Sequence, residues 1–105
     1  MTPDTMSDTA VLLAAKVEVP QHVVYRSFPS ETVVLNLLTG KYHGLNATAG
    51  RMLEELERAA CVRDAAAALA ENYDRAQDRV EHDLCDLCRA LLERGLIEAD
   101  GGFEP

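Results

Sequence analysis

The 105-residue chain is poor in basic residues: ten Lys and Arg stand against eighteen Asp and Glu, which gives a net charge of -8 at pH 7. Phosphate backbones are bound by basic surfaces, so this balance argues against a nucleic acid as the main partner. Long apolar runs are also missing. None approaches the roughly 20 residues that cross a bilayer, and the N-terminus has aspartates where a signal peptide needs positive charge. We therefore expect a cytoplasmic protein with no membrane partner.

Cysteine is scarce as well, and an odd count of three is poor material for a disulfide framework. The set that could ligate a metal is His82, Cys85 and Cys88. Structural zinc usually takes four ligands, with a second pair elsewhere in the chain. These three fan over about 120° of one predicted helix, and Cys61 and His43 would have to be recruited. Mid-helix positions also argue against redox use. We expect reduced, metal-free cysteines that serve as small core or groove residues.

Catalytic motifs are absent too. The sequence has no glycine-framed nucleophile, no phosphate-binding loop and no carboxylate pair inside an apolar pattern. At this length the chain forms one domain with a modest core, which leaves little room for a deep enzyme cleft. The sequence therefore predicts a protein that is not an enzyme, has no catalytic residues and uses no cofactor.

What the chain does contain is a series of three short strands. β-Branched and aromatic residues predict strands at residues 22–28, 32–38 and 41–46. Gly40, in the second connection, can supply the positive φ of a hairpin with a glycine bulge. Three such strands form an antiparallel meander. Because a meander of this size is marginal alone, it must pack on helices.

Three helices follow the strands. Asn46 is placed to cap the first helix, and the second covers residues 61–73. Asp74 followed by Gln77 resembles a capping box that opens the third helix, and Gly95 ends it. Apolar residues recur at helical spacing in all three segments, so we expect each helix to bury one face.

The two ends of the chain lack a sustained pattern. We expect residues 1–16 to be a flexible N-terminus and residues 99–105 a C-terminal tail. The predicted fold class is α+β: a three-stranded antiparallel meander followed by three helices, similar in outline to a winged helix. That outline makes a winged-helix transcription regulator the alternative from another functional class. A recognition helix should present basic or amide side chains to base edges, whereas the third helix carries outward acids: Glu81, Asp83, Asp86 and Glu93.

The third helix also carries more apolar surface than one core contact needs. Two adjacent stripes are present, one of Val80, Leu84, Leu87 and Leu91 and one of Cys85, Cys88 and Leu92. The second stripe must be covered by the sheet, by another subunit or by a ligand. The third strand of a meander is an edge that can accept a strand from a partner. Gly44 in that strand allows close backbone approach, or marks a bulge. These features favour recognition of an extended peptide.

Three segments, "VVLNLLTGKYHGLNATAGRMLEEL", "VRDAAAALAENYD" and "DLCDLCRALLERGLI", resemble the PqqD-like family, the RiPP recognition elements that bind leader peptides of ribosomally made natural products. The first part of the family pattern is matched by Leu35, Asn36, Thr39, Gly40, Lys41, Tyr42, Leu45, Asn46 and Gly50. The last helix matches it at Asp83, Leu84, Leu87, Cys88, Leu91, Leu92, Arg94, Gly95 and Leu96. The resemblance covers residues 20–98 and places a PqqD-like domain at residues 17–98. The stretch "LLTGKYHGLN" is closer to the stand-alone versions of lasso-peptide pathways.

The resemblance implies that a leader peptide adds as a strand along the third strand and lies against the third helix. It nominates as peptide-binding residues Lys41, Tyr42, His43, Gly44, Val80, Asp83, Leu84 and Leu87. It also implies a non-catalytic adaptor that presents the precursor to a maturation enzyme, which in lasso pathways is a cysteine leader peptidase or an ATP-dependent cyclase. The alternative within the family is a PqqD-type chaperone of another RiPP or quinone-cofactor pathway.

Overall fold

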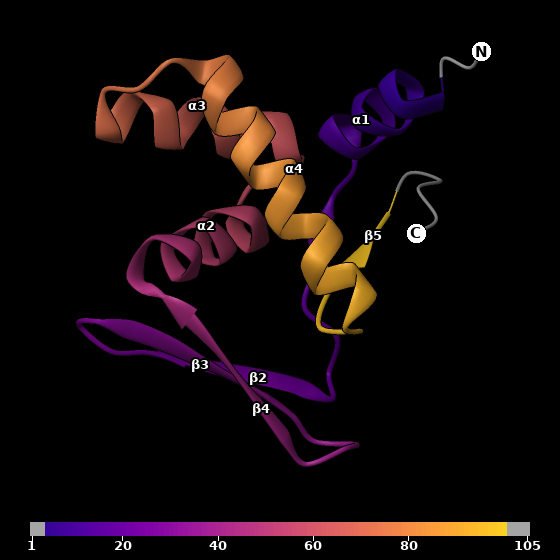
Figure 1. Cartoon of the computed structure of the whole chain (residues 1–105), viewed down its shortest axis with the longest axis vertical. Helices are drawn as coiled ribbons and strands as arrows, with labels where there is room; N and C mark the ends of the chain where they lie inside the picture. Colours follow the sequence, from indigo (N-terminus) through magenta and orange to yellow (C-terminus); the bar gives the residue numbers. More distant parts are fainter. Residues whose placement is uncertain (1–3, 101–105) are drawn as a thin grey trace.

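The computed structural model of the chain describes residues 4–100 (Figure 1). Its elements in chain order are α1 (Asp4–Ala14), β1 (Val17–Glu18), β2 (Val23–Ser27), β3 (Glu31–Asn36), β4 (Lys41–Asn46), α2 (Ala47–Arg58), α3 (Val62–Tyr73), α4 (Gln77–Glu93) and β5 (Glu98–Ala99). Strands β2, β3 and β4 form one antiparallel sheet, and Figure 1 shows all the helices on one side of it. The fold is α+β, as predicted. Within residues 4–100, no helix has the length and apolar character needed to cross a membrane.

The meander has the predicted order and an unbroken register. Val34 in β3 is paired with Tyr25 in β2 and with His43 in β4. Residues directly opposite one another in antiparallel strands share a face of the sheet. Val34 is buried, as are Thr32 and Asn36, so this face packs on the helices and the intervening residues face outward. Strand β4 is paired on one side only, which confirms that it is an edge strand.

The connection between β3 and β4 is organised by Asn36. Its side-chain oxygen accepts hydrogen bonds from the backbone N–H groups of Leu38 at 2.9 Å and Thr39 at 3.3 Å. Gly40 has a φ of 74°, and its N–H donates to the Asn36 carbonyl at 2.7 Å. The positive φ predicted at Gly40 is therefore confirmed, and glycine adopts this conformation without the steric strain that a Cβ would bring.

The residues at the helix ends match the prediction from the sequence at two of three positions. Asn46 caps α2 as predicted, because its side chain accepts the N–H of the residue three positions on at 2.8 Å. Gly95, with a φ of 72°, follows α4 as predicted. The capping box at Asp74 and Gln77 is wrong. Asp74 instead ends α3 in the left-handed conformation, with a φ of 54°, and Ala76 precedes α4. Asp tolerates this conformation because its short polar side chain can bond locally.

The N-terminal region differs from the flexible segment that we expected. Residues 4–14 form α1, and Leu12 has no exposed surface. The carbonyl of Ala15 accepts the N–H of Val62, at the start of α3, at 3.0 Å. A helical period was hard to see here because the apolar run is short. At the other end, β5 pairs with β1, and the Asp100 N–H donates to the Lys16 carbonyl at 2.8 Å. The rest of the two predicted terminal segments, residues 1–3 and 101–105, lies outside the described residues.

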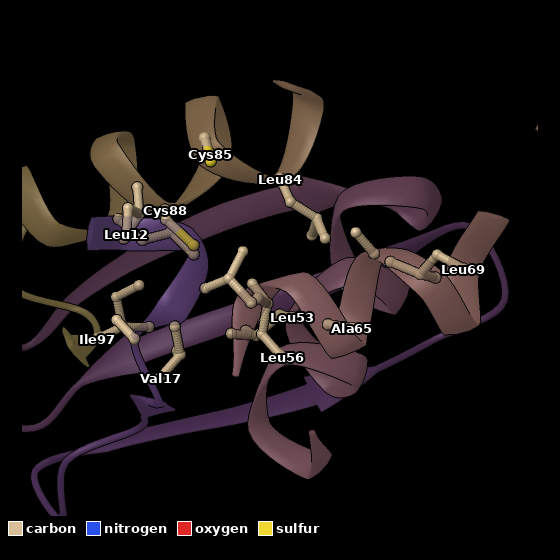
Figure 2. Close-up of a cluster of buried hydrophobic side chains, with 14 of the residues drawn as sticks. Leu12, Val17, Leu53, Leu56, Ala65, Leu69, Leu84, Cys85, Cys88 and Ile97 are labelled. Atoms are coloured by element: carbon tan, nitrogen blue, oxygen red, sulfur yellow. The ribbon is translucent and has the colours of Figure 1, made fainter. Parts of the chain in front are cut away.

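Helix α1 also covers the second apolar stripe of α4. Arg89 Nη2 donates to the hydroxyl of Thr9 on α1 at 3.0 Å. Cys85 and Cys88 are buried in the same cluster as Leu12 (Figure 2). The surplus apolar surface, which was expected to need the sheet, another subunit or a ligand, is thus covered by a helix of the same chain. It is no longer an argument for a binding surface.

Candidate functional site

The free edge of β4 is the first part of the candidate site. Since His43 is paired with the buried Val34, it points toward the helices together with Lys41 and Leu45. Tyr42 and Gly44 therefore point to the outer face, where Tyr42 is 71% exposed. Alternate backbone N–H and C=O groups of β4 point away from β3, as they do in any edge strand. Such groups can pair with a further strand.

Gly44 is an ordinary member of this edge. It is paired with Val33 in a continuous register, so the bulge that the sequence left open as an alternative is absent at this position. A Cβ added to Gly44 would meet no atom of the described chain within 4 Å. Glycine is therefore not required at this position by packing within residues 4–100. It leaves the outer face of β4 bare next to Tyr42.

Helix α4 has two flanks beside its buried stripe. At about 100° per residue, one flank carries Cys85, Arg89 and Leu92. The hydrogen bond from Arg89 to Thr9 places this flank against α1. The opposite flank, here called the Asp83 flank, carries Asp83, Leu87, Ala90 and Arg94. All but the exposed Arg94 are half-buried. The Asp83 flank is the side of α4 that faces away from α1.

A cavity of about 110 Å³ adjoins the Asp83 flank. It lies between the first turns of α2 and α4 and the end of α3, and its lining comprises Thr48, Met52, Leu69, Tyr73, Arg75, Val80 and Asp83. Tyr73 is held in place by Arg51, whose Nη1 donates to the tyrosine hydroxyl at 3.2 Å. Because α2 begins directly after β4, Thr48 connects this cavity to the end of the free edge. The cavity can accept an apolar side chain.

The nominated residues are not all available to a ligand. Lys41, Tyr42 and Gly44 are exposed, and His43, Asp83 and Leu87 are half-buried. Leu84, however, has no exposed surface, and Val80 is only 5% exposed. Both side chains belong to the core, so Leu84 cannot contact a peptide and Val80 contributes only to the wall of the cavity. The helical period identified the apolar stripe correctly, but it did not indicate which members lie at the stripe's edge.

The residues that the sequence did not nominate are Thr48, Met52, Leu69, Tyr73 and Arg75. Most of them come from α2 and α3, and no spacing within one segment links them. Tyr73 gave the only signal in the sequence, as an aromatic residue at the end of a predicted helix, and the structure leaves its side chain 47% exposed.

The ionisable groups around α4 do not form a reactive site. His82 contacts the carboxylate of Asp86 at 3.3 Å on the exposed face, whereas Cys85 and Cys88 are buried and free thiols. Burial raises the pKa of Cys88 to about 12 and also raises the pKa of Cys85. Such thiols are poor nucleophiles at neutral pH. Within residues 4–100, no group of three or more His, Cys, Asp or Glu side chains is placed to hold a metal.

Comparison with known proteins identifies the family. The family model described as coenzyme PQQ synthesis protein D (PqqD) matches residues 31–97. The chain is similar to the solved structure of TbiB1 in complex with the TbiA(beta) leader peptide, with 32% identity and a TM-score of 0.71 over 84% of this chain and 99% of that chain. It shares its fold with a lasso peptide synthetase B1 complexed with the leader peptide, at 24% identity and a TM-score of 0.71, over 80% of this chain and 99% of that one. No curated protein matches. Since the family model covers more than half of the chain, the chain belongs to the PqqD family.

Proposed function

We propose that this protein is a non-catalytic adaptor of lasso-peptide biosynthesis, which binds the leader region of a precursor peptide and presents it to a leader peptidase. The similarity to TbiB1, whose structure holds a leader peptide, supports the proposal most directly, because it extends over 99% of that chain. The free β4 edge beside a cavity supplies the physical means. A presenting adaptor of this kind acts in the cytoplasm and needs no cofactor.

The proposed binding mode is strand addition. The leader pairs with the backbone of β4 over Lys41 to Gly44 and runs along the Asp83 flank of α4. Backbone hydrogen bonds supply affinity, and pockets for alternate side chains supply specificity. The cavity next to Asp83 and Thr48 is the natural pocket for one apolar side chain. Leu87 adds apolar surface further along the same flank.

A matched pair of leucines on α4 tests this placement. Leu87 lies on the Asp83 flank and Leu92 on the flank toward α1, and both are half-buried against the core. Leu87→Ser and Leu92→Ser should therefore cost similar amounts of stability. We expect Leu87→Ser to weaken binding of a fluorescent leader peptide at least tenfold and Leu92→Ser to leave it within twofold. Equal losses for the two variants would reject the placement.

The peptide backbone provides a second test. In an antiparallel pair, only alternate residues of the leader donate hydrogen bonds to β4. Of two leader peptides that are N-methylated at adjacent positions, one should lose binding and the other should keep it. Equal binding by both peptides would contradict strand addition. The mass of the full precursor should stay unchanged on incubation with the purified protein alone. Cleavage or modification in that mixture would contradict the adaptor role.

A second candidate is a chaperone role in coenzyme PQQ synthesis or another RiPP pathway. The description of the matching family supports it. The two candidates differ in the peptide that is bound. A binding assay with a lasso leader and with the precursor peptide of the quinone cofactor, under the same conditions, separates them.

A further inference from the structure

The outer face of the sheet is unusually apolar. When one face of an antiparallel sheet packs on the core, the other is normally polar. Here the outer face carries a shallow hollow, which we call the outer patch, lined by Val24, Arg26, Phe28, Val33, Leu35 and Tyr42. Tyr25 also borders it, although its side chain points inward and its hydroxyl donates to Glu57 on α2. Val24 is 46% exposed and Phe28 is 49% exposed. Figure 1 shows the helices on the opposite side of the sheet, so none of them covers this face.

The charges of the chain limit what can cover the outer patch. Among the described residues that line the outer patch, Arg26 is the only basic one and none is acidic. The chain as a whole carries a net charge of -8. Two copies joined by this face would bring together two negatively charged chains as well as two arginines, so they would repel one another. An anionic membrane would also be repelled by the negative charge of the chain. The complementary partner is a protein with an apolar patch, a carboxylate opposite Arg26 and basic residues around them.

The position of the outer patch relative to β4 indicates which protein this partner is. A peptide strand added to β4 extends the sheet by one strand, and every second side chain of that peptide lies on the outer face beside Tyr42. A protein seated on the outer patch would therefore touch the bound peptide as well as the sheet. We propose that the outer patch is the docking surface for the maturation enzyme that acts on the bound precursor. This inference rests on the proposed function and assigns it a second surface.

Two substitutions with the same change of charge test the docking surface. Val24→Glu places an acid in the outer patch on β2, the strand farthest from the leader edge. Val11→Glu places the same acid on α1, where Val11 is 38% exposed. Phe28→Ser serves as a second patch variant without a charge. For each full-length protein, we would measure folding by circular dichroism, leader binding by fluorescence anisotropy, and the protein concentration that gives half-maximal cleavage of the precursor by the purified cognate leader peptidase.

We expect Val24→Glu and Phe28→Ser to bind leader within twofold of the wild type, and to need at least a tenfold higher concentration for half-maximal cleavage. Val11→Glu should behave as wild type in both assays. Normal stimulation of cleavage by the two patch variants would overturn the inference, as would a loss of leader binding in folded patch variants. A wild-type dimer that Val24→Glu dissociates would also overturn it, because the occupant would then be a second copy. Failure of the wild type to bind leader would instead refute the proposed function.

Discussion

The backbone of Gly50 in α2 lies directly against the side chain of Thr32 in β3. A Cβ at position 50 would overlap both the hydroxyl oxygen and the Cβ of Thr32, and Thr32 is only 2% exposed. This contact sets how closely α2 approaches the sheet. Since α2 starts at the end of β4 and lines the cavity through Thr48 and Met52, the same contact sets the position of the candidate site.

Gly50→Ala should destabilise the protein, although alanine favours a helix over glycine by about 1 kcal/mol. The overlap with Thr32 outweighs that gain, and overpacking a filled core typically costs about 1–3 kcal/mol. Urea unfolding of the single variant measures the cost. Thr32→Ala removes the hydroxyl that is in closest contact. The double variant should therefore lose less free energy of unfolding than the two single variants lose together. Strict additivity would mean that the overlap is relieved elsewhere.

Helix α1 should behave as part of the folded domain. Leu12 has no exposed surface, whereas its neighbour Val11 is 38% exposed. Leu12→Ala should lower the free energy of unfolding by about 2–5 kcal/mol, the range for a buried leucine, and Val11→Ala should change it by about 0.5 kcal/mol or less. Thermal or urea unfolding checks both variants. An equally small effect of Leu12→Ala would mean that α1 is detached in solution.

The sequence predicted the elements with strong local signals. The three strands, Gly40 and the Asn46 cap are each specified by a few neighbouring residues, and all are confirmed, although the second strand ends at Asn36 and not at residue 38 as predicted. Helix α1 was missed because its apolar run is too short to show a period, and it forms by packing on α3 and α4. Asp74 was misplaced because Asp is equally suited to a helix cap and to a left-handed turn. The choice between these two uses depends on where α4 begins, and α4 begins at Gln77, three residues after Asp74.

The buried thiol of Cys88 makes a prediction about alkaline pH. Burial raises its pKa from an ordinary value of 9.0 to about 12, and the neighbouring Cys85 adds to the shift. Between these two values the unfolded chain loses the proton and the folded protein keeps it. Stability is therefore full below about pH 9 and falls as the pH rises toward about 12, by at most about 1.4 kcal/mol per pH unit for this group.

Urea unfolding at a series of alkaline pH values checks this slope. Tyr25, whose pKa is also raised by burial and by its hydrogen bond to Glu57, contributes in the same direction at higher pH. Cys88→Ala removes only the cysteine contribution, so its stability should fall less steeply with pH than that of the wild type, whatever its stability at neutral pH. Identical slopes for the two proteins would show that Cys88 ionises normally in the folded state.

The site was harder to predict than the fold. The β4 edge follows from strand order, since the third strand of a meander has one neighbour. The cavity does not follow from any local pattern, because Thr48, Tyr73 and Asp83 lie on three helices that only tertiary packing brings together. Leu84 was nominated because it belongs to the same apolar stripe as Leu87. One turn of helix separates them, yet one is in the core and the other is at its edge.

The cavity leads to a prediction about the leader itself. An extended peptide directs alternate side chains to one face, so one apolar or aromatic side chain should enter the cavity and its neighbours should not. Alanine at the leader's main aromatic residue should weaken binding by about 1–3 kcal/mol, the range for burying a large apolar side chain. Alanine at the next residue should have little effect. Thr48→Phe narrows the cavity and should therefore weaken binding of the wild-type leader. The leader with alanine in place of its aromatic residue should bind this variant almost as well as the wild-type leader does.

Salt dependence separates this pocket from simple charge attraction. Among the described residues that line the cavity, Asp83 is the only acid, and it lies with Arg75 among mainly apolar side chains. If the pocket selects the leader, moderate salt should change the affinity little, because burial of apolar surface is not screened. Asp83→Asn should then have a small effect, similar to that of Asp86→Asn on the exposed face. An affinity that falls steeply with salt but ignores the aromatic side chain would mean that the acidic surface of α4 does the selecting.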